Sequence, residues 1–154
     1  MRGLLALWRL ARVLRCIASG WWTLQWHFAR MSLAQREQAI QAWAERMLHA
    51  LGIELQVQGE RLQQGPILRV ANHISWLDIL SLLALGHCRF VAKAEVHHWP
   101  LIGPMAAAAG TLFIERQSSR DALRVVHQMA QALKDGDVLA VFPEGTTSDG
   151  QGLL

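Results

Sequence analysis

The sequence predicts an α/β fold, a layered domain with a mostly parallel sheet, preceded by N-terminal amphipathic helices. Three observations support this expectation. From residue 53 onward, stretches with strand character alternate with stretches of helical periodicity. Val138–Phe142 is a short, wholly apolar run of the kind that parallel sheets bury. Before residue 53, apolar side chains recur about every 3.6 residues, as they do along one face of a helix.

Residues 1–30 form the first expected helix, and it is amphipathic. Four of the seven tryptophans lie here, and indole prefers the headgroup zone of a bilayer. Within residues 1–30 the longest uncharged stretch, Cys16–Ala29, has 14 residues, whereas a spanning helix needs about 20. We therefore expect a peripheral or monotopic helix in the membrane interface, on the cytoplasmic face, with arginines facing anionic headgroups. The apolar stripe comprises Leu7, Leu10, Val13, Leu14, Ile17, Trp21, Leu24 and Phe28, and the opposing cations are Arg2, Arg9, Arg12 and Arg15.

Residues 1–30 also permit two interpretations without a membrane. The helix could pack on the protein's own core, or it could be a secretory signal peptide. Arg9, Arg12 and Arg15 interrupt the apolar stretch that a signal peptide requires, and no clear cleavage site follows it.

Charge is unevenly distributed along the chain. Residues 1–36 contain six arginines and no acidic residue, whereas residues 37–154 contain nine basic and twelve acidic residues. The body is therefore mildly acidic, which argues against nucleic-acid binding. Cys16 and Cys88 have no close-spaced partner, so the sequence predicts neither a disulfide framework nor a zinc site and suits a reducing compartment.

The second expected helix covers residues 31–52. Ser32 is its predicted N-cap, with Gln35 at the capping-box distance, and Gly52 ends it. The apolar–polar alternation of Ile53, Leu55 and Val57 then predicts a half-buried strand. The remaining expected elements are strands at Ile67–Ala71, Arg89–Ala92, Thr111–Ile114 and Val138–Phe142, and helices at Trp76–Leu85, at Pro100–Ala109 and from the cap Ser118 to Lys134.

Candidate functional residues follow the strand ends, where α/β sheets bind ligands. After the strand at Ile67–Ala71 come His73 and Asp78. An imidazole held by a carboxylate has a fixed tautomer and can accept a proton from a hydroxyl near neutral pH. Asp78 has a second possible role, because its spacing from Ser75 is that of a helix capping box.

Two further strand ends carry polar groups. Arg116 follows the strand at Thr111–Ile114, and a guanidinium suits a phosphate. Taken alone, its position also fits a surface arginine paired with Glu115, which is the more ordinary interpretation. Glu144, Gly145 and Thr146 follow the last apolar strand, where backbone N–H groups and hydroxyls suit an anionic ligand.

The order of these blocks is more specific than any one of them. Asn-His-x-Ser-x-x-Asp, Gly-x-x-Phe-Ile-x-Arg and Phe-Pro-Glu-Gly-Thr, in this order, resemble the glycerolipid acyltransferase family, typified by 1-acyl-glycerol-3-phosphate acyltransferase. The intervening Ala92–Glu95 and Trp99–Gly103 also resemble that family. The resemblance covers about residues 53–150.

The resemblance implies that His73 is the general base and that Asp78 orients it. The implied reaction is O-acyl transfer from acyl-CoA or acyl-carrier protein to the free hydroxyl of a lysolipid in the membrane, with no metal, no cofactor and no acyl-enzyme. The acceptor it most directly implies is 1-acyl-glycerol-3-phosphate, which gives phosphatidic acid in phospholipid biosynthesis. The blocks matched by Arg116, Glu144, Gly145 and Thr146 bind the phosphate-bearing head, and we expect Glu144 to hold Arg116 or the turn in place.

Two departures from the family pattern widen the range of functions that the sequence permits. Thr147 stands where the family often has an arginine, so lyso-ornithine lipid or another lysophospholipid is an alternative acceptor. Family members continue through a fourth, Val-Pro-rich block, so we expect the acyltransferase domain at residues 53–154 to be C-terminally incomplete. A thioester hydrolase and an inactive membrane-binding remnant also fit the sequence. His87, Cys88, His97 and His98 do not have the spacing of metal ligands.

Overall fold

The computed structural model describes residues 2–60, 65–115 and 119–150. In it the chain divides into two compact units. One consists of Met1–Arg61 with Ile79–His87, and the other of Leu62–Asp78 with Cys88–Leu154. The predicted site residues that the structure describes, His73, Asp78, Glu144, Gly145 and Thr146, all belong to the second unit.

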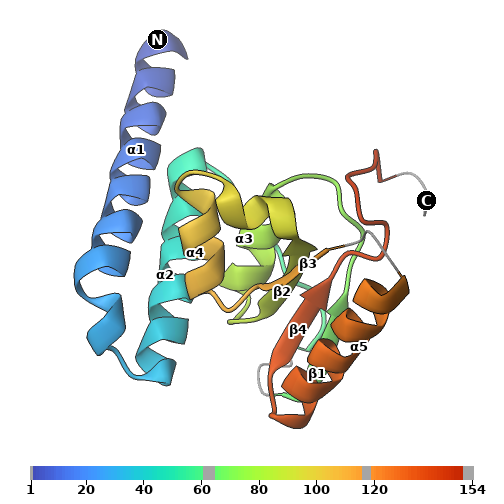
Figure 1. The fold of residues 1–154 in the computed structure, drawn as a ribbon. Coiled ribbons are helices and arrows are strands. Elements are labelled where there is room, and N and C mark those ends of the chain that lie inside the picture. Colours follow the sequence, from blue (N-terminus) through green and yellow to red (C-terminus); the bar gives the residue numbers. More distant parts are fainter. Residues whose placement is uncertain (1, 61–64, 116–118, 151–154) are drawn as a thin grey trace. The chain divides into compact units, whose positions relative to one another are not determined.

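The first unit is built on two long helices, α1 (Arg2–Trp26) and α2 (Leu33–Leu51), which pack against each other (Figure 1). The short helix η1 (Phe28–Arg30) joins them. The indole N–H of Trp43 donates to the carbonyl of Cys16 at 3.0 Å. Gly20 permits this approach, because a Cβ there would clash with the indole ring. Cys16 is consequently buried on the α2 side of α1.

The predicted ends of α2 are confirmed in atomic detail. Ser32 Oγ accepts from the backbone N–H of Gln35 at 3.3 Å, and the Gln35 side chain accepts from the N–H of Ser32 at 2.9 Å. Gly52 ends the helix in the left-handed conformation, with φ of 78°. Between these ends, the buried face of α2 comprises Ala44, Met47, Leu48 and Ala50.

Two expectations for the first unit require correction. Ile53–Val57 is not a strand, because it pairs with no strand of the described residues. The predicted apolar stripe of α1 is divided: Val13 and Ile17 are half-buried, whereas Leu7 and Leu14 are exposed. Part of the stripe is therefore packed within the unit, and part of it is exposed. Among the described residues, no helix combines the length and the apolar character that crossing a bilayer requires.

The second unit contains a parallel four-stranded sheet, in agreement with the predicted fold class. Its strands lie in the order β1-β4-β2-β3, and neighbouring strands are parallel. Helix α5 packs against β3 and β4 (Figure 1). The strands are β1 (Ile67–Val70), β2 (Arg89–Lys93), β3 (Leu112–Ile114) and β4 (Val138–Val141), and the helices are η2 (Ala94–His98), α4 (Ile102–Ala108) and α5 (Ser119–Lys134). Helix α3 (Leu77–Ala84) begins in this unit and continues in the first.

Strand β4 is the centre of the core, as its apolar run predicts. Val138, Leu139 and Ala140 are all buried, and Leu139 is completely inaccessible. Arg89, the first residue of β2, links that strand to the residues that precede β3 and β4. Its Nε donates to the carbonyl of Gly110 at 2.7 Å, and its guanidinium pairs with the Asp137 carboxylate. The predicted N-cap of α5, Ser118, lies outside the described residues.

The parallel arrangement brings the carboxyl ends of the strands to one edge of the sheet. Because β1 and β4 are neighbours, with Val70 opposite Val141, the segments that follow them start side by side. These segments carry His73 and Glu144. The fold therefore brings together two of the three blocks identified in the sequence.

Candidate active site

His73 is positioned by the loop that connects β1 to α3. The N–H of Ala71 donates to the carbonyl of Val141 at 3.2 Å, so the loop leaves the sheet just beyond the end of β1. Leu77 then begins α3, with Asp78 in its first turn. The loop is short, and it therefore holds the imidazole close to the start of the helix.

His73 and Asp78 form the predicted pair. Nδ1 of His73 lies 2.9 Å from Oδ2 of Asp78. The same carboxylate oxygen accepts the backbone N–H groups of Ile74, at 2.7 Å, and of Ser75, at 2.8 Å. The two side chains are 19% and 25% exposed, so the pair is shielded but accessible at its edge. The contact expected between the two side chains is therefore present.

Asp78 stays ionised because of its hydrogen bonds. Burial acts against the charge, but the backbone N–H of Ser75, the imidazole of His73 and the N–H of Ile74 together outweigh it and lower the pKa of Asp78 below its ordinary value. An ionised carboxylate has no proton to donate, so the hydrogen between the two groups belongs to Nδ1. The unprotonated nitrogen of a neutral His73 is therefore Nε2.

Nε2 is the ring nitrogen that Asp78 leaves free. Within residues 2–60, 65–115 and 119–150, no side chain or backbone group forms a hydrogen bond with it. A lone pair on a partly exposed imidazole, with a carboxylate behind it, can accept a proton from a bound hydroxyl or water. Asp78 then stabilises the imidazolium that forms, since the opposite charges are in direct contact.

The capping role considered for Asp78 is also present. Ser75 Oγ accepts from the N–H of Leu77 at 3.2 Å, while the Asp78 carboxylate accepts from the N–H of Ser75. The same carboxylate thus caps the start of α3 and holds His73. The catalytic and the capping interpretation are therefore compatible, because one side chain can make both sets of contacts.

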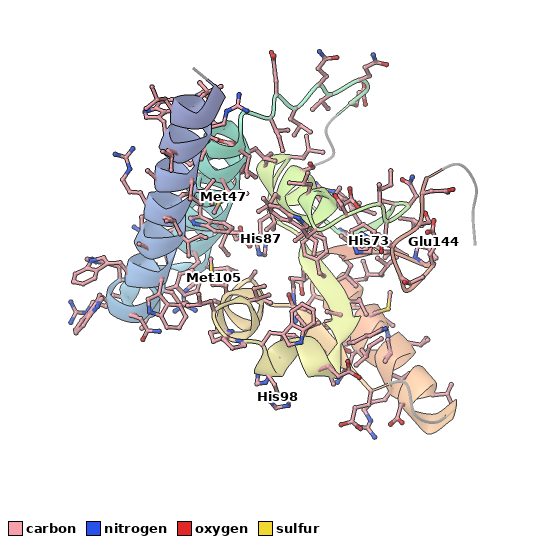
Figure 2. The ribbon with its side chains drawn as sticks, turned by 90° about the horizontal axis from the view of Figure 1, so that it is seen from above. Met47, His73, His87, His98, Met105 and Glu144 are labelled. Carbon is pink, nitrogen blue, oxygen red and sulfur yellow. The ribbon has the colours of Figure 1, made fainter. Side chains whose placement is uncertain are left out.

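The segment after β4 packs directly on His73. Figure 2 shows His73 and Glu144, which come from the two adjacent segments. The N–H of Ser148 donates to the carbonyl of His73 at 2.7 Å. The phenyl ring of Phe142 stacks on the imidazole, with centroids 4.1 Å apart and planes inclined by 18°. The sequence motif that contains Phe142 predicts no role for the phenyl ring. The one relevant signal in the sequence is that Phe142 directly follows an apolar strand that is expected to be buried.

Glu144 has an unusual environment. Both of its carboxylate oxygens are inaccessible, and neither has a hydrogen-bond partner among the residues that the structure describes. Gly145 turns the chain with φ of 67°, and its N–H donates to the carbonyl of Phe142 at 3.1 Å. Thr146 is exposed next to this turn. Arg116, the cation expected near Glu144, lies outside the described residues, so that pairing stays a prediction.

The histidines and cysteines elsewhere in the chain do not extend this site. Across the described ranges, no three histidine, cysteine or carboxylate side chains are grouped so as to hold a metal ion. His97 contacts His98 and Phe113 through edge-to-face ring packing at 5.3 and 4.9 Å. Cys88 is buried, and burial raises its pKa to about 11 despite the neighbouring Arg69, so it is a poor nucleophile.

Comparison with known proteins finds acyltransferases among the proteins that are similar to this chain. A lyso-ornithine lipid O-acyltransferase from Pseudomonas aeruginosa is 42% identical over 99% of the chain, which spans 61% of that relative. A 1-acyl-sn-glycerol-3-phosphate acyltransferase from Neisseria gonorrhoeae is 40% identical over 77% of the chain and 47% of the relative. In fold, the chain is similar to the crystal structure of the 1-acyl-sn-glycerophosphate (LPA) acyltransferase PlsC from Thermotoga maritima. That likeness has a TM-score of 0.68 and 22% identity, and it covers 95% of this chain and 66% of the other.

The family assignment rests on a match that includes the whole of the candidate site. The model of the acyltransferase family matches residues 54–154, which contain the His73–Asp78 pair and the turn at Glu144. The chain spans less than two thirds of the length of the two relatives from Pseudomonas and Neisseria. The family match and the identity to these relatives show that the chain belongs to the acyltransferase family.

Proposed function

We propose that this protein transfers a fatty acyl group from acyl-CoA or acyl-carrier protein to the free hydroxyl of a lysolipid. The observation that carries the proposal is the His73–Asp78 pair at the carboxyl edge of the sheet, with Nε2 unoccupied among the described residues. A base with a free lone pair needs only a substrate hydroxyl and an activated acyl group. Membership of the acyltransferase family supports this chemistry over other uses of the same pair.

The proposed reaction proceeds in two steps without an acyl-enzyme. Nε2 of His73 takes the proton of the lysolipid hydroxyl as its oxygen attacks the thioester carbonyl, which forms a tetrahedral oxyanion. The oxyanion collapses, the carbon–sulfur bond breaks, and the imidazolium returns the proton to the departing thiolate. Asp78 stabilises the imidazolium between the two steps. The products are an ester and a free thiol, and the proposed mechanism uses no metal and no cofactor.

The acceptor head is proposed to bind through Arg116, Glu144, Gly145 and Thr146. Two acceptors are supported, 1-acyl-glycerol-3-phosphate and lyso-ornithine lipid, because relatives with both names align with this chain. Thr147 makes lyso-ornithine lipid as strong a candidate as 1-acyl-glycerol-3-phosphate. The family often has an arginine at this position, and that arginine would supply a phosphate-binding cation. A panel that contains both acceptors separates them directly.

Helix α1 is proposed to bind the membrane interface where the acceptor resides. Trp8, Trp22 and Trp26 are 56%, 60% and 62% exposed, and their spacing places them on one face of the helix. The guanidinium of Arg12 lies 4.4 Å from the Trp8 ring centre, so an indole and a cation are available together to an anionic bilayer. The unpaired cysteines favour the reducing, cytoplasmic side.

Acyl transfer is tested with labelled acyl-CoA or acyl-carrier protein, vesicles and a panel of lysolipids. The wild-type protein is expected to form diacyl product, and His73→Ala is expected to lower the rate by about 10²–10⁴-fold. His127→Ala is the matched control, because His127 is exposed on α5 and forms no part of the site. Release of free fatty acid without acylated lipid, or full activity of His73→Ala, would overturn the proposal.

Membrane binding is tested by flotation with anionic vesicles. Changing Trp8, Trp22 and Trp26 together to alanine is expected to weaken binding about 100-fold, on the basis of about 1 kcal/mol for each partly inserted indole. Trp99→Ala is the control, because Trp99 is exposed but belongs to the second unit. Unchanged flotation of the triple variant would exclude this face of α1 as the binding surface.

A further inference from the structure

The imidazole of the candidate base is the first of three stacked aromatic rings. The imidazole of His73 stacks on Phe142, with centroids 4.1 Å apart, and Phe142 stacks in turn on Phe90, with centroids 6.0 Å apart and planes inclined by 14°. The rings come from the segment after β1, the residue directly after β4 and the body of β2. These three strands are consecutive neighbours in the sheet. Phe90 is only 5% exposed, so the stack of rings ends in the buried core.

Hydrogen bonding alone does not fix the plane of the imidazole. Asp78 holds the ring at a single atom, Nδ1. Small coupled rotations about the two side-chain torsions of His73 would keep this hydrogen bond while tilting the ring and moving Nε2, which Cε1 separates from Nδ1. Nearly parallel contact with Phe142 removes this freedom, because any tilt of the imidazole would drive its edge into the phenyl face.

We propose that Phe142 is a positioning residue for His73, and that Phe90 supports it from the core. The stack sets the direction in which Nε2 points and shields one face of the base from water. The phenyl ring acts through the imidazole and does not touch the substrate. The expected effect on catalysis rests on the proposed function. The stacking itself does not depend on which acyl acceptor is used.

A positioning ring and a simple apolar filler respond differently to substitution. Leucine at position 142 would keep the site apolar and would bury a similar surface, but it has no flat face to align the imidazole. Tyrosine would keep the ring. A filler role predicts that Phe142→Leu behaves like Phe142→Tyr, whereas a positioning role predicts that only the leucine variant is impaired.

The kinetic test compares Phe142→Leu, Phe142→Tyr and the control Phe113→Leu. Phe113 is half-buried on β3 and contacts His97 instead of His73. We expect Phe142→Leu to lower kcat about tenfold with little change in KM, because misplacing a catalytic atom by a fraction of an ångström costs rate rather than binding. The two remaining variants are expected to retain kcat within about threefold. Equal impairment of the leucine and tyrosine variants, or an unchanged kcat in Phe142→Leu, would overturn the proposal.

A spectroscopic test distinguishes failure of this inference from failure of the proposed function. The ring current of Phe142 should shift the His73 ring C–H signals upfield in the wild-type protein, because the two rings are stacked, and NMR with labelled histidine can detect this shift without any substrate. The shift is expected to disappear in Phe142→Leu and to persist in Phe142→Tyr and Phe113→Leu. If the wild-type protein shows the shift but transfers no acyl group, the proposed function fails while the stack stands. If Phe142→Leu leaves the signals unmoved, the positioning role fails even in an active enzyme.

Discussion

Replacing Asp78 with asparagine tests the site at the atom where three hydrogen bonds meet. Oδ2 of Asp78 accepts from His73 at 2.9 Å, from Ile74 at 2.7 Å and from Ser75 at 2.8 Å. Asparagine has nearly the same shape and retains one oxygen that accepts hydrogen bonds. It removes the negative charge, however, so the substitution isolates the electrostatic part of the pair from its capping part.

The expected magnitude follows from the contact distance. Two unit charges at 2.9 Å attract by about 6 kcal/mol at an effective dielectric constant near 20. Because the two side chains are 19% and 25% exposed, solvent screens part of this attraction. We assign about half of it, roughly 3 kcal/mol, to stabilisation of the imidazolium, and this corresponds to about a 10²-fold loss in kcat. KM should change little, since the charge develops only during the reaction.

Initial rates of acyl transfer in vesicles measure this effect. Asp135→Asn is the control, because Asp135 is an exposed carboxylate that accepts a hydrogen bond from Gln131 at 2.9 Å, far from the base along the chain. A loss in kcat of less than about threefold in Asp78→Asn would refute the assigned role of the carboxylate. So would a loss that affects only KM.

The remaining predictions concern stability and reactivity. The lowered pKa of Asp78 stabilises the folded protein at pH values above the ordinary pKa of 3.8, and this stabilisation is lost as the pH falls through the folded-state pKa. Urea unfolding should therefore show a larger difference in the free energy of unfolding between wild type and Asp78→Asn near pH 7 than near pH 3. Leu139→Ala should lower the free energy of unfolding by about 2–5 kcal/mol, because Leu139 is completely buried, and thermal melting should show it. Cys88 should resist thiol reagents at pH 8 in the native protein and react after unfolding, because it is buried and its pKa is raised to about 11; prompt labelling of native protein, detected by mass spectrometry, would contradict this.

The sequence predicts the second unit well because its signals are local. The apolar run of β4, the strands at Ile67 and Arg89, and the helix ending at Lys134 each depend on short-range periodicity and turn residues, and each is present within a residue or two. The capping box at Ser32 is equally local, since its two hydrogen bonds join residues three apart.

The differences between expectation and structure arise where tertiary partners decide the outcome. Ile53–Val57 has the alternation of a strand, but strand formation requires a neighbour with free backbone groups, and none pairs with it in the described part of the chain. In α1, periodicity identifies an apolar face but does not say what covers it. The close contact of Trp43 with Gly20, two residues far apart in sequence, determines which part α2 buries. The stack of Phe142 on His73 is unpredictable for the same reason, since it depends on β4 lying next to β1.

The spacing of His73 and Asp78 has a local physical origin. An acidic residue in the first turn of a helix is favoured by the free N–H groups and the dipole at that end, and its carboxylate points back toward the residues that precede the helix. Asp78 does this when it accepts from the N–H groups of Ser75 and Ile74, and the next group it meets along the chain is the side chain of His73. Helix capping therefore builds the pair, and it also keeps the carboxylate ionised. One residue inserted between His73 and Ile74 would preserve the contacts of Asp78 with Ile74 and Ser75 but would displace the imidazole, so a folded protein without a working base is the expected result.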